Sequence, residues 1–237
     1  NNACGSHSIV YGSTRDHLLE LKTILSDGTE AVFGKVTKDE FLEKCRLTGL
    51  EGDIYRQADR MLSDKRNLKE IAEGYPDPAI PRRNTGYAID LLADSEIFTE
   101  GSKRAFSFCS LLAGSEGTLA VSTEIKLSLV KLPPVNKALV CIHLSVRNDA
   151  FHANLIALKY KPAAVEMMDD RILRLTENNL SQKNNRFFLV GEPESIVIVE
   201  FAAEDPAELD SRIAGMTEEL RQAGYGYAFP VVRGKDI

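Results

Sequence analysis

The 237-residue sequence contains no tryptophan, few cysteines and no long apolar run. No apolar stretch approaches the roughly 20 residues of a membrane-spanning helix, so no transmembrane segment is predicted. The cysteines are scattered and form no Cys-x-x-Cys pair, which argues against a zinc knuckle, an iron–sulfur cluster and a disulfide scaffold. Such thiols are compatible with a reducing cytoplasm. They are Cys4, Cys45, Cys109 and Cys141.

The chain also lacks an excess of basic residues. Its formal net charge is −6 and its isoelectric point is near 5.4. A general binder of nucleic acid or of a membrane surface would present a basic face. We therefore expect no nucleic-acid partner, although a local basic pocket is compatible with this charge.

Several enzyme motifs are missing as well. The sequence has no Gly-x-Ser-x-Gly elbow, no Walker loop and no Gly-x-Gly-x-x-Gly fingerprint. Its histidines have no partner at metal-like spacing, so no metal site is predicted. His143 alternates with apolar residues in a predicted strand, which favours a core or interface histidine over a ligand. For His7, a functional and a structural role both stay open.

The most informative stretch covers residues 112–121. An apolar segment, residues 106–112, runs into a tight turn with glycines at 114 and 117, and a second apolar segment leaves it. Glycine has no Cβ, so another molecule can approach the backbone closely. Exposed N–H groups in such a turn can hold an anion. The simpler interpretation is a structural turn between two buried segments.

The first half of the chain predicts a mixture of strands and helices. A hairpin is expected over residues 18–33 around the Asp27-Gly28 turn. Residues 37–40 have capping-box spacing ahead of a helix, and one longer helix follows at about 54–73. A strand is expected over residues 119–132, where apolar side chains recur at every second position.

Three prolines make residues 75–81 a stiff loop, because proline cannot continue a helix. Arg82 and Arg83 follow this loop directly. They either face an anionic group or are simply exposed. The sequence Lys-Leu-Pro-Pro at residues 131–134 is the clearest linker, and we place a domain boundary there.

The second half has its own pattern of elements. Without a further helix at 169–179, its order is βαββαβ, which is a ferredoxin-like order with right-handed crossovers. The strands are expected at residues 139–146, 163–168, 195–203 and 225–232, and the other helices at about 149–158 and 206–223.

Three motifs resemble a known family in their order along the chain. They are Asn-Asn-Ala-Cys-Gly-Ser-His-Ser-Ile-Val-Tyr-Gly-Ser-Thr-Arg-Asp at residues 1–16, Arg-Asn-Thr-Gly-Tyr-Ala-Ile-Asp at 83–90, and Gly-Ser-Glu-Gly-Thr-Leu-Ala-Val-Ser-Thr-Glu-Ile at 114–125. The sequence is similar to FAD-linked oxidases, a family that includes glycolate oxidase subunits, D-lactate dehydrogenases and D-2-hydroxyglutarate dehydrogenases.

The resemblance implies an α+β fold. Residues 1–132 would be the second half of a vanillyl-alcohol-oxidase-type FAD-binding domain, with a helical insertion at about 37–73. Residues 135–237 would be part of a ferredoxin-like cap domain. The fold alone would not prove a function.

The resemblance also implies which residues bind FAD. Cys4 departs from the glycine or serine usual at its position, and nothing specific indicates covalent flavin attachment. We expect Glu116 to turn away from phosphate or to bond backbone. The residues carried over are Asn2, Ala3, Cys4, Gly5, Ser6, Tyr11 and Gly12 from the first motif, and Gly117, Thr118, Ala120 and Val121 from the third.

The family's upstream Pro-Gly-Gly-Gly-Thr loop is not found in this chain, and its substrate-binding arginine and metal-binding histidine motifs would come later. We therefore expect a piece of a longer protein that holds about half of a flavin site. Alone, it is expected to bind FAD weakly or not at all and to have no turnover. No catalytic residue is assigned within it.

By resemblance, the parent protein is a cytoplasmic D-2-hydroxy acid dehydrogenase, or one peripheral to the inner membrane. Its substrate is expected to be lactate, glycolate or 2-hydroxyglutarate, with hydride passing to flavin N5. A separate acceptor then takes the electrons, and in long family members this is a C-terminal iron–sulfur domain. Residues 82–87 and the helical insertion resemble those long forms. The alternatives are a non-catalytic α+β interaction module and a flavin oxidase of sugars or aromatic alcohols.

Overall fold

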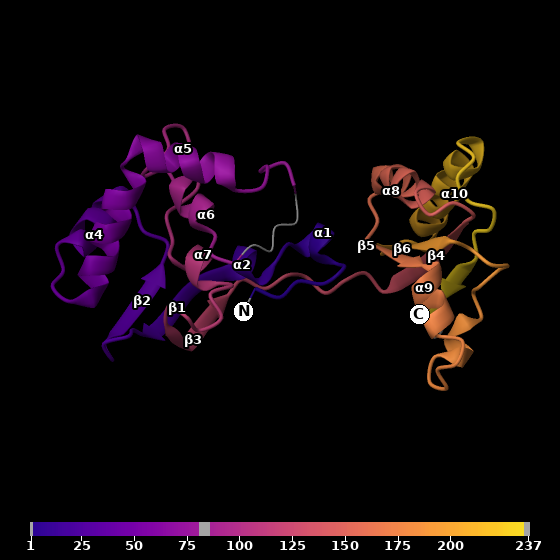
Figure 1. Ribbon diagram of the computed structural model, residues 1–237, viewed down its shortest axis with the longest axis horizontal. Coiled ribbons are helices and arrows are strands. Elements are labelled where there is room, and N and C mark those ends of the chain that lie inside the picture. Colours follow the sequence, from indigo (N-terminus) through magenta and orange to yellow (C-terminus); the bar gives the residue numbers. More distant parts are fainter. Residues whose placement is uncertain (1, 81–85, 235–237) are drawn as a thin grey trace. The chain divides into compact units, whose positions relative to one another are not determined.

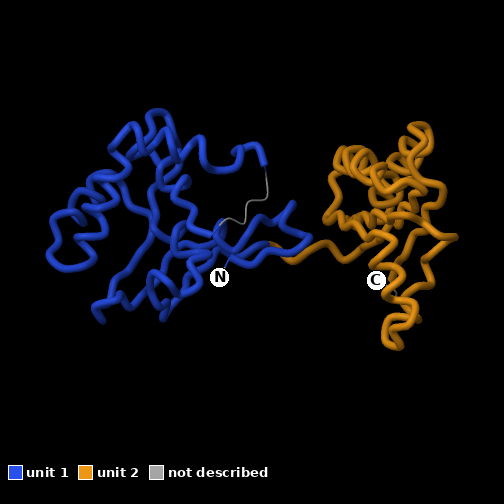
Figure 2. Tube along the Cα trace, in the orientation of Figure 1, with its two compact units in different colours: residues 1–130 blue, residues 131–237 orange. Residues whose placement is uncertain are grey.

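The structure is a computed structural model that describes residues 2–80 and 86–234. The chain divides into two compact units, residues 1–130 and residues 131–237 (Figure 2). The division falls at the Lys-Leu-Pro-Pro sequence of the expected linker. Each unit combines helices with an antiparallel sheet, so the α+β fold class is confirmed.

The sheet of the first unit has three strands in the order β2-β1-β3. Strands β1 (Leu18–Ile24) and β2 (Glu30–Gly34) form the predicted hairpin, in which Leu21 lies opposite Phe33. The Asp27 carboxylate accepts hydrogen bonds from the backbone and hydroxyl of Thr29, which closes the turn. Strand β3 (Val121–Leu127) pairs with the other edge of β1.

Helices cover one face of this sheet (Figure 1). The predicted capping box at Thr37 is confirmed, because its hydroxyl accepts from the backbone of Glu40. The single helix expected over residues 54–73 is wrong. The first helix ends at Leu62. Asp64 then caps a new helix, because its side chain accepts a hydrogen bond from the backbone N–H of Arg66. The helices that follow β2 are α3 (Lys38–Cys45), α4 (Leu50–Leu62), α5 (Lys65–Gly74), α6 (Ile89–Ala93) and α7 (Cys109–Leu112).

An aromatic cluster holds these helices on the sheet. Phe106 stands edge-on to Phe41 and Phe108, with ring centroids 4.9 and 5.0 Å apart. Tyr55 of α4 meets Phe108 at 4.9 Å in the same way. Such pairs are stabilising beyond the area that they bury. The segment that leads into the glycine turn at residues 114–118 is therefore held in the core by Phe106 and Phe108.

Strand β3 differs from its expected environment. It spans Val121–Leu127 rather than residues 119–132, and every one of its residues is exposed. Val121 and Ile125 are each 61% exposed. The alternation of apolar residues correctly predicts a strand, but the third motif leads from the core into an edge strand rather than into a second buried segment.

The second unit has the predicted ferredoxin-like topology. Its sheet has the strand order β5-β6-β4-β7, and all neighbours are antiparallel. Helix α8 (Asp149–Lys159) and helix α10 (Pro206–Gln222) pack on one face of the sheet (Figure 1). The shorter helix α9 (Asp170–Leu175) packs on the other face through Leu173. The strands are β4 (Asn136–Leu144), β5 (Ala164–Asp169), β6 (Ser195–Ala203) and β7 (Val231–Arg233), of which β7 is shorter than expected.

His143 is a core residue, as its sequence context predicts. It is fully buried, and each of its two ring nitrogens is within hydrogen-bond distance of a backbone group. Nδ1 lies 2.9 Å from the carbonyl oxygen of Cys141, and Nε2 accepts a hydrogen bond of 3.2 Å from the N–H of Val190. This pattern requires the neutral Nδ1–H tautomer. Burial lowers the pKa of His143 below its ordinary value.

Candidate functional site

The first glycine loop is anchored at Asn2. Its side-chain oxygen accepts a hydrogen bond of 2.8 Å from the backbone N–H of Arg15. Its amide nitrogen, Nδ2, is buried and has no hydrogen-bond partner in the described part of the chain. The next residue, Ala3, offers its carbonyl to the hydroxyl of Thr14 at 2.9 Å. The side-chain oxygen of Asn2 and the carbonyl of Ala3 thus fix the loop to the protein. The Asn2 Nδ2 donor is left for an acceptor outside the described residues.

Beyond this anchor the loop is open until it reaches a short helix, α1 (Ser8–Tyr11). A Cβ at Gly5 would meet no atom within 4 Å, and the Gly5 N–H makes no hydrogen bond to the described residues. Cys4 and Ser6, on either side, are half-buried. The hydroxyl of Ser8 is buried without a hydrogen-bond partner among these residues.

Gly12 has a structural reason to be glycine. Its φ is +74°, and a Cβ there would lie 2.7 Å from Oδ2 of Asp16. That carboxylate accepts from the backbone and hydroxyl of Ser13, which begins helix α2 (Thr14–His17). The carbonyl of Tyr11 lies 2.5 Å from Nε2 of His17. Tyr11 and Gly12 therefore shape the end of the first loop.

The third motif forms a tight turn in which three of the four residues 114–117, all except Ser115, have positive φ. The φ angles of Gly114, Glu116 and Gly117 are 93°, 53° and 79°. The carbonyl of Ser115 accepts from the N–H and the hydroxyl of Thr118. The side chain of Glu116 is exposed. A Cβ at Gly117 would meet nothing within 4 Å, so the backbone of this turn is accessible to another molecule.

Arg15 joins all three motifs, and sequence reasoning did not single it out. Its side chain is 7% exposed. Nη2 donates to the carbonyls of Gly86 at 2.7 Å and Ala113 at 2.6 Å, while its backbone N–H holds Asn2. The only available signal was its position within the first motif. That an arginine in a four-residue helix is buried could not be read from the local pattern.

A second set of bonds ties the middle motif to the turn. The hydroxyl of Tyr87 is hydrogen-bonded to the hydroxyl of Thr118. The hydroxyl of Tyr75, from the proline-rich loop, donates to the carbonyl of Tyr87 at 2.6 Å. The interpretation of Arg82 and Arg83 lies outside the described residues.

The remaining residues of the third motif lie elsewhere. Ala120 lines an apolar cavity of about 260 Å³ between the sheet and α4, together with Leu112 and Leu119. Val121 begins the exposed strand β3. The structure thus brings Asn2 and the turn together around Arg15, whereas no described contact links Ala120 or Val121 to the first loop.

The free donors of the first loop and the open turn have the chemistry that the anionic part of a dinucleotide cofactor requires. Asn2 Nδ2 and Ser8 Oγ are buried donors without acceptors among the described residues. The open backbone at Gly5 and Gly117 would let a phosphate come close. Buried polar groups without partners are costly, so an acceptor oxygen supplied by a ligand would satisfy them.

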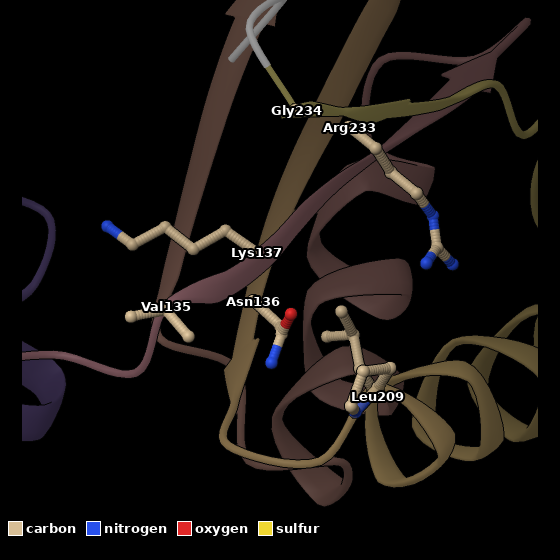
Figure 3. Close-up of a pocket in the computed structure, with 7 residues that line it drawn as sticks. Val135, Asn136, Lys137, Leu209, Arg233 and Gly234 are labelled. Atoms are coloured by element: carbon tan, nitrogen blue, oxygen red, sulfur yellow. The ribbon is translucent and has the colours of Figure 1, made fainter.

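The second unit has a cavity of about 420 Å³ between β4, β7 and the start of α10 (Figure 3). Arg233 reaches toward Leu209, while Lys137 points away. Arg233 is ion-paired with Asp210, and Asn136 donates to the carbonyl of Glu204. The polar groups of this cavity are thus engaged within the protein, and they do not form a reactive site.

Other chemistry finds little support in the described ranges. No cluster of three or more histidine, cysteine or acidic side chains suitable for a metal occurs there. Burial raises the pKa of Cys109 and raises that of Cys141 to about 11, so neither thiol is a ready nucleophile. Among the same residues, no helix combines the length and apolar character needed to cross a membrane.

Comparison with known proteins agrees with the motifs. No protein-family model matches the chain. It is 28% identical over 225 residues to a D-2-hydroxyglutarate dehydrogenase of Pseudomonas putida, covering 93% of this chain and 21% of that protein. It is 34% identical over 90 residues to the glycolate oxidase subunit GlcD of Escherichia coli, covering 36% of this chain and 18% of that protein. A solved alkyldihydroxyacetonephosphate synthase gives a TM-score of 0.48 at 12% identity, over 97% of this chain and 32% of that one.

These relatives confirm the resemblance that the three motifs indicate: the chain is similar to D-2-hydroxyglutarate dehydrogenases and to a glycolate oxidase subunit, a class of enzymes named for 2-hydroxy acids. Within that class, the relatives that match it over more than nine tenths of its length are D-2-hydroxyglutarate dehydrogenases. The chain spans about a fifth of the length of these relatives.

Proposed function

We propose that the protein to which this chain belongs is an FAD-dependent dehydrogenase of a D-2-hydroxy acid, with 2-hydroxyglutarate as the first candidate substrate. The observation that carries the proposal is the convergence of three distant motifs on Arg15, beside the unsatisfied amide nitrogen of Asn2. The similarity to D-2-hydroxyglutarate dehydrogenases over most of the chain supports the choice of substrate.

In this proposal the first unit is the closing part of the FAD-binding domain and the second unit is the start of the cap. Asn2, Ser8 and the backbone at Gly5 and Gly117 would hold the phosphate-bearing part of FAD. Bound FAD would supply the acceptor for the hydride that leaves the substrate carbon bearing the hydroxyl group. This chain's contribution is to bind and orient the cofactor, and no catalytic residue is assigned within it.

The electron acceptor and the location of the parent protein belong to the same proposal. About four fifths of the length of its relatives lies outside the matched region, which leaves room for an iron–sulfur domain. Cys45, Cys109 and Cys141 are thiols outside disulfides, which supports a cytoplasmic location, at the inner membrane surface or free of it.

The test is a flavin and substrate assay on the purified full-length protein. We expect a yellow protein that retains FAD, whose flavin absorbance is bleached anaerobically by D-2-hydroxyglutarate but not by the L-isomer. D-lactate and glycolate serve as competing candidates, and iron analysis tests for the cluster. A full-length protein without flavin, or with a flavin that none of these acids reduces, would contradict the proposal.

A further inference from the structure

Arg15 connects segments that are far apart in the sequence. One of its nitrogens, Nη2, donates to the carbonyl oxygens of Gly86, in the second motif, and of Ala113, the residue just before the third motif. Its own backbone N–H donates to Asn2 in the first motif. Hydrogen bonds from a charged donor are stronger than those between neutral groups. A single residue thus sets the spacing of three loops.

The packing around this guanidinium leaves little freedom. A Cβ on Gly114 would lie 2.9 Å from Nη2, 3.1 Å from the Gly86 oxygen and 3.5 Å from Cβ of Asn2. The turn, the middle motif and the first loop are therefore in contact around Arg15. A shift of the guanidinium would move all of them together.

Arg15 also decides which atom of the Asn2 amide is left without a partner among the described residues. Its N–H occupies the side-chain oxygen of Asn2, so the donor Nδ2 is the atom left over. An amide that presents its N–H₂ group suits an acceptor such as a phosphate or carbonyl oxygen. Without the bond to Arg15, the amide would be free to rotate and to lose this preference.

We propose that Arg15 is a positioning residue of the cofactor site. Its guanidinium holds the turn and the first loop at the spacing that FAD requires, and its backbone orients the Asn2 amide, without contact to FAD. This inference rests on the proposed function. It predicts that loss of Arg15 weakens FAD binding by lowering the fraction of protein whose loops are already arranged for it.

The chain offers a matched control in Arg56 of helix α4. Its Nη1 also donates to two backbone carbonyls, those of Cys45 at 2.6 Å and Leu47 at 2.7 Å. This clamp lies in the helical segment, and none of its described bonds reaches the three motifs. A variant at Arg56 therefore loses a similar clamp without loosening the cofactor loops.

The experiment compares R15M, R15K and R56M in the full-length protein. FAD is removed and added back, its dissociation constant is measured from the quenching of flavin fluorescence, and the melting temperature of each apoprotein is recorded. We expect R15M to raise the dissociation constant by about tenfold or more. R15K, which keeps the charge but not the planar guanidinium, should rescue part of this loss. R56M should lower the melting temperature and leave FAD affinity unchanged.

Wild-type affinity in R15M, or an equal loss in R56M, would overturn the role of Arg15 while leaving the proposed function intact. If R15M does not fold, the role of Arg15 is tested with R15K alone, by its FAD dissociation constant and its hydrogen exchange. An unchanged dissociation constant, with unchanged hydrogen exchange at residues 113–118, then overturns the proposal, and a weaker affinity with faster exchange supports it. A wild-type protein that takes up no FAD refutes the proposed function and this inference together.

Discussion

The substitution Gly114→Ala tests how tightly the turn is packed against Arg15, and Gly117→Ala is its matched partner. Both glycines have positive φ, at 93° and 79°. A Cβ at Gly114 would press on Nη2 of Arg15 and on the Gly86 carbonyl, whereas a Cβ at Gly117 would project into open space. The pair separates the cost of the backbone conformation from the cost of the contact.

The magnitudes follow from these contacts. A left-handed conformation costs a non-glycine residue about 1–2 kcal/mol, which is the full effect expected for Gly117→Ala. In Gly114→Ala the 2.9 Å contact also displaces a guanidinium nitrogen that donates to two carbonyls. Because a hydrogen bond to a charged group contributes about 1.5–3 kcal/mol, the total loss should reach about 3–4 kcal/mol.

The assay is urea unfolding followed by far-ultraviolet circular dichroism, with hydrogen exchange measured at residues 113–118. The two units can unfold separately, so the transition of the first unit is identified by a core variant in it. Only that transition should move in either glycine variant. Equal losses for the two substitutions, or a larger loss for Gly117→Ala, would refute the packing of the turn against Arg15.

Two further predictions concern the cores of the units. Phe106→Ala removes a fully buried ring from the aromatic cluster and should cost about 3–5 kcal/mol in the first unit, with the midpoint of the second unit unchanged; a loss below about 1 kcal/mol would contradict the packing. The pKa of His143 is lower in the folded protein than in the unfolded chain, so on acidification the unfolded chain binds this proton at a higher pH. The free energy of unfolding of the second unit should therefore be full above about pH 6.5. Below it, this free energy should fall by at most about 1.4 kcal/mol per pH unit. Urea midpoints measured between neutral and mildly acid pH should show this fall in the wild type and a smaller one in His143→Gln, and identical pH profiles would contradict it.

Local patterns were sufficient for much of the fold. The Asp27-Gly28 turn between two apolar runs predicts the hairpin because this dipeptide adopts the required turn, and the structure has it. Thr37 and Glu40 stand at capping-box spacing and make those bonds. In the second half, alternating strands and helices predict the βαββαβ order, and the strand order β5-β6-β4-β7 agrees with it.

Two other features, the break between two helices and the exposure of strand β3, could not be predicted from local sequence patterns. The apolar spacing over residues 54–73 suits one helix, but the Asp64 side chain offers the backbone a new start, and two helices form. Strand β3 has the alternation of a half-buried strand, yet all of its residues are exposed. Whether a face is buried depends on what packs against it, which is a property of the tertiary structure.

The sequence by itself determined the motifs, their order and the class of protein, because these rest on residue types at fixed spacing. It also determined the small residues of the two glycine loops, since only a backbone without Cβ can be approached closely. Only the tertiary structure decided that the three motifs meet, and that they meet at Arg15. A hydrogen bond between residues 71 or 98 positions apart is set by packing, and no local pattern announces which arginine will be buried there.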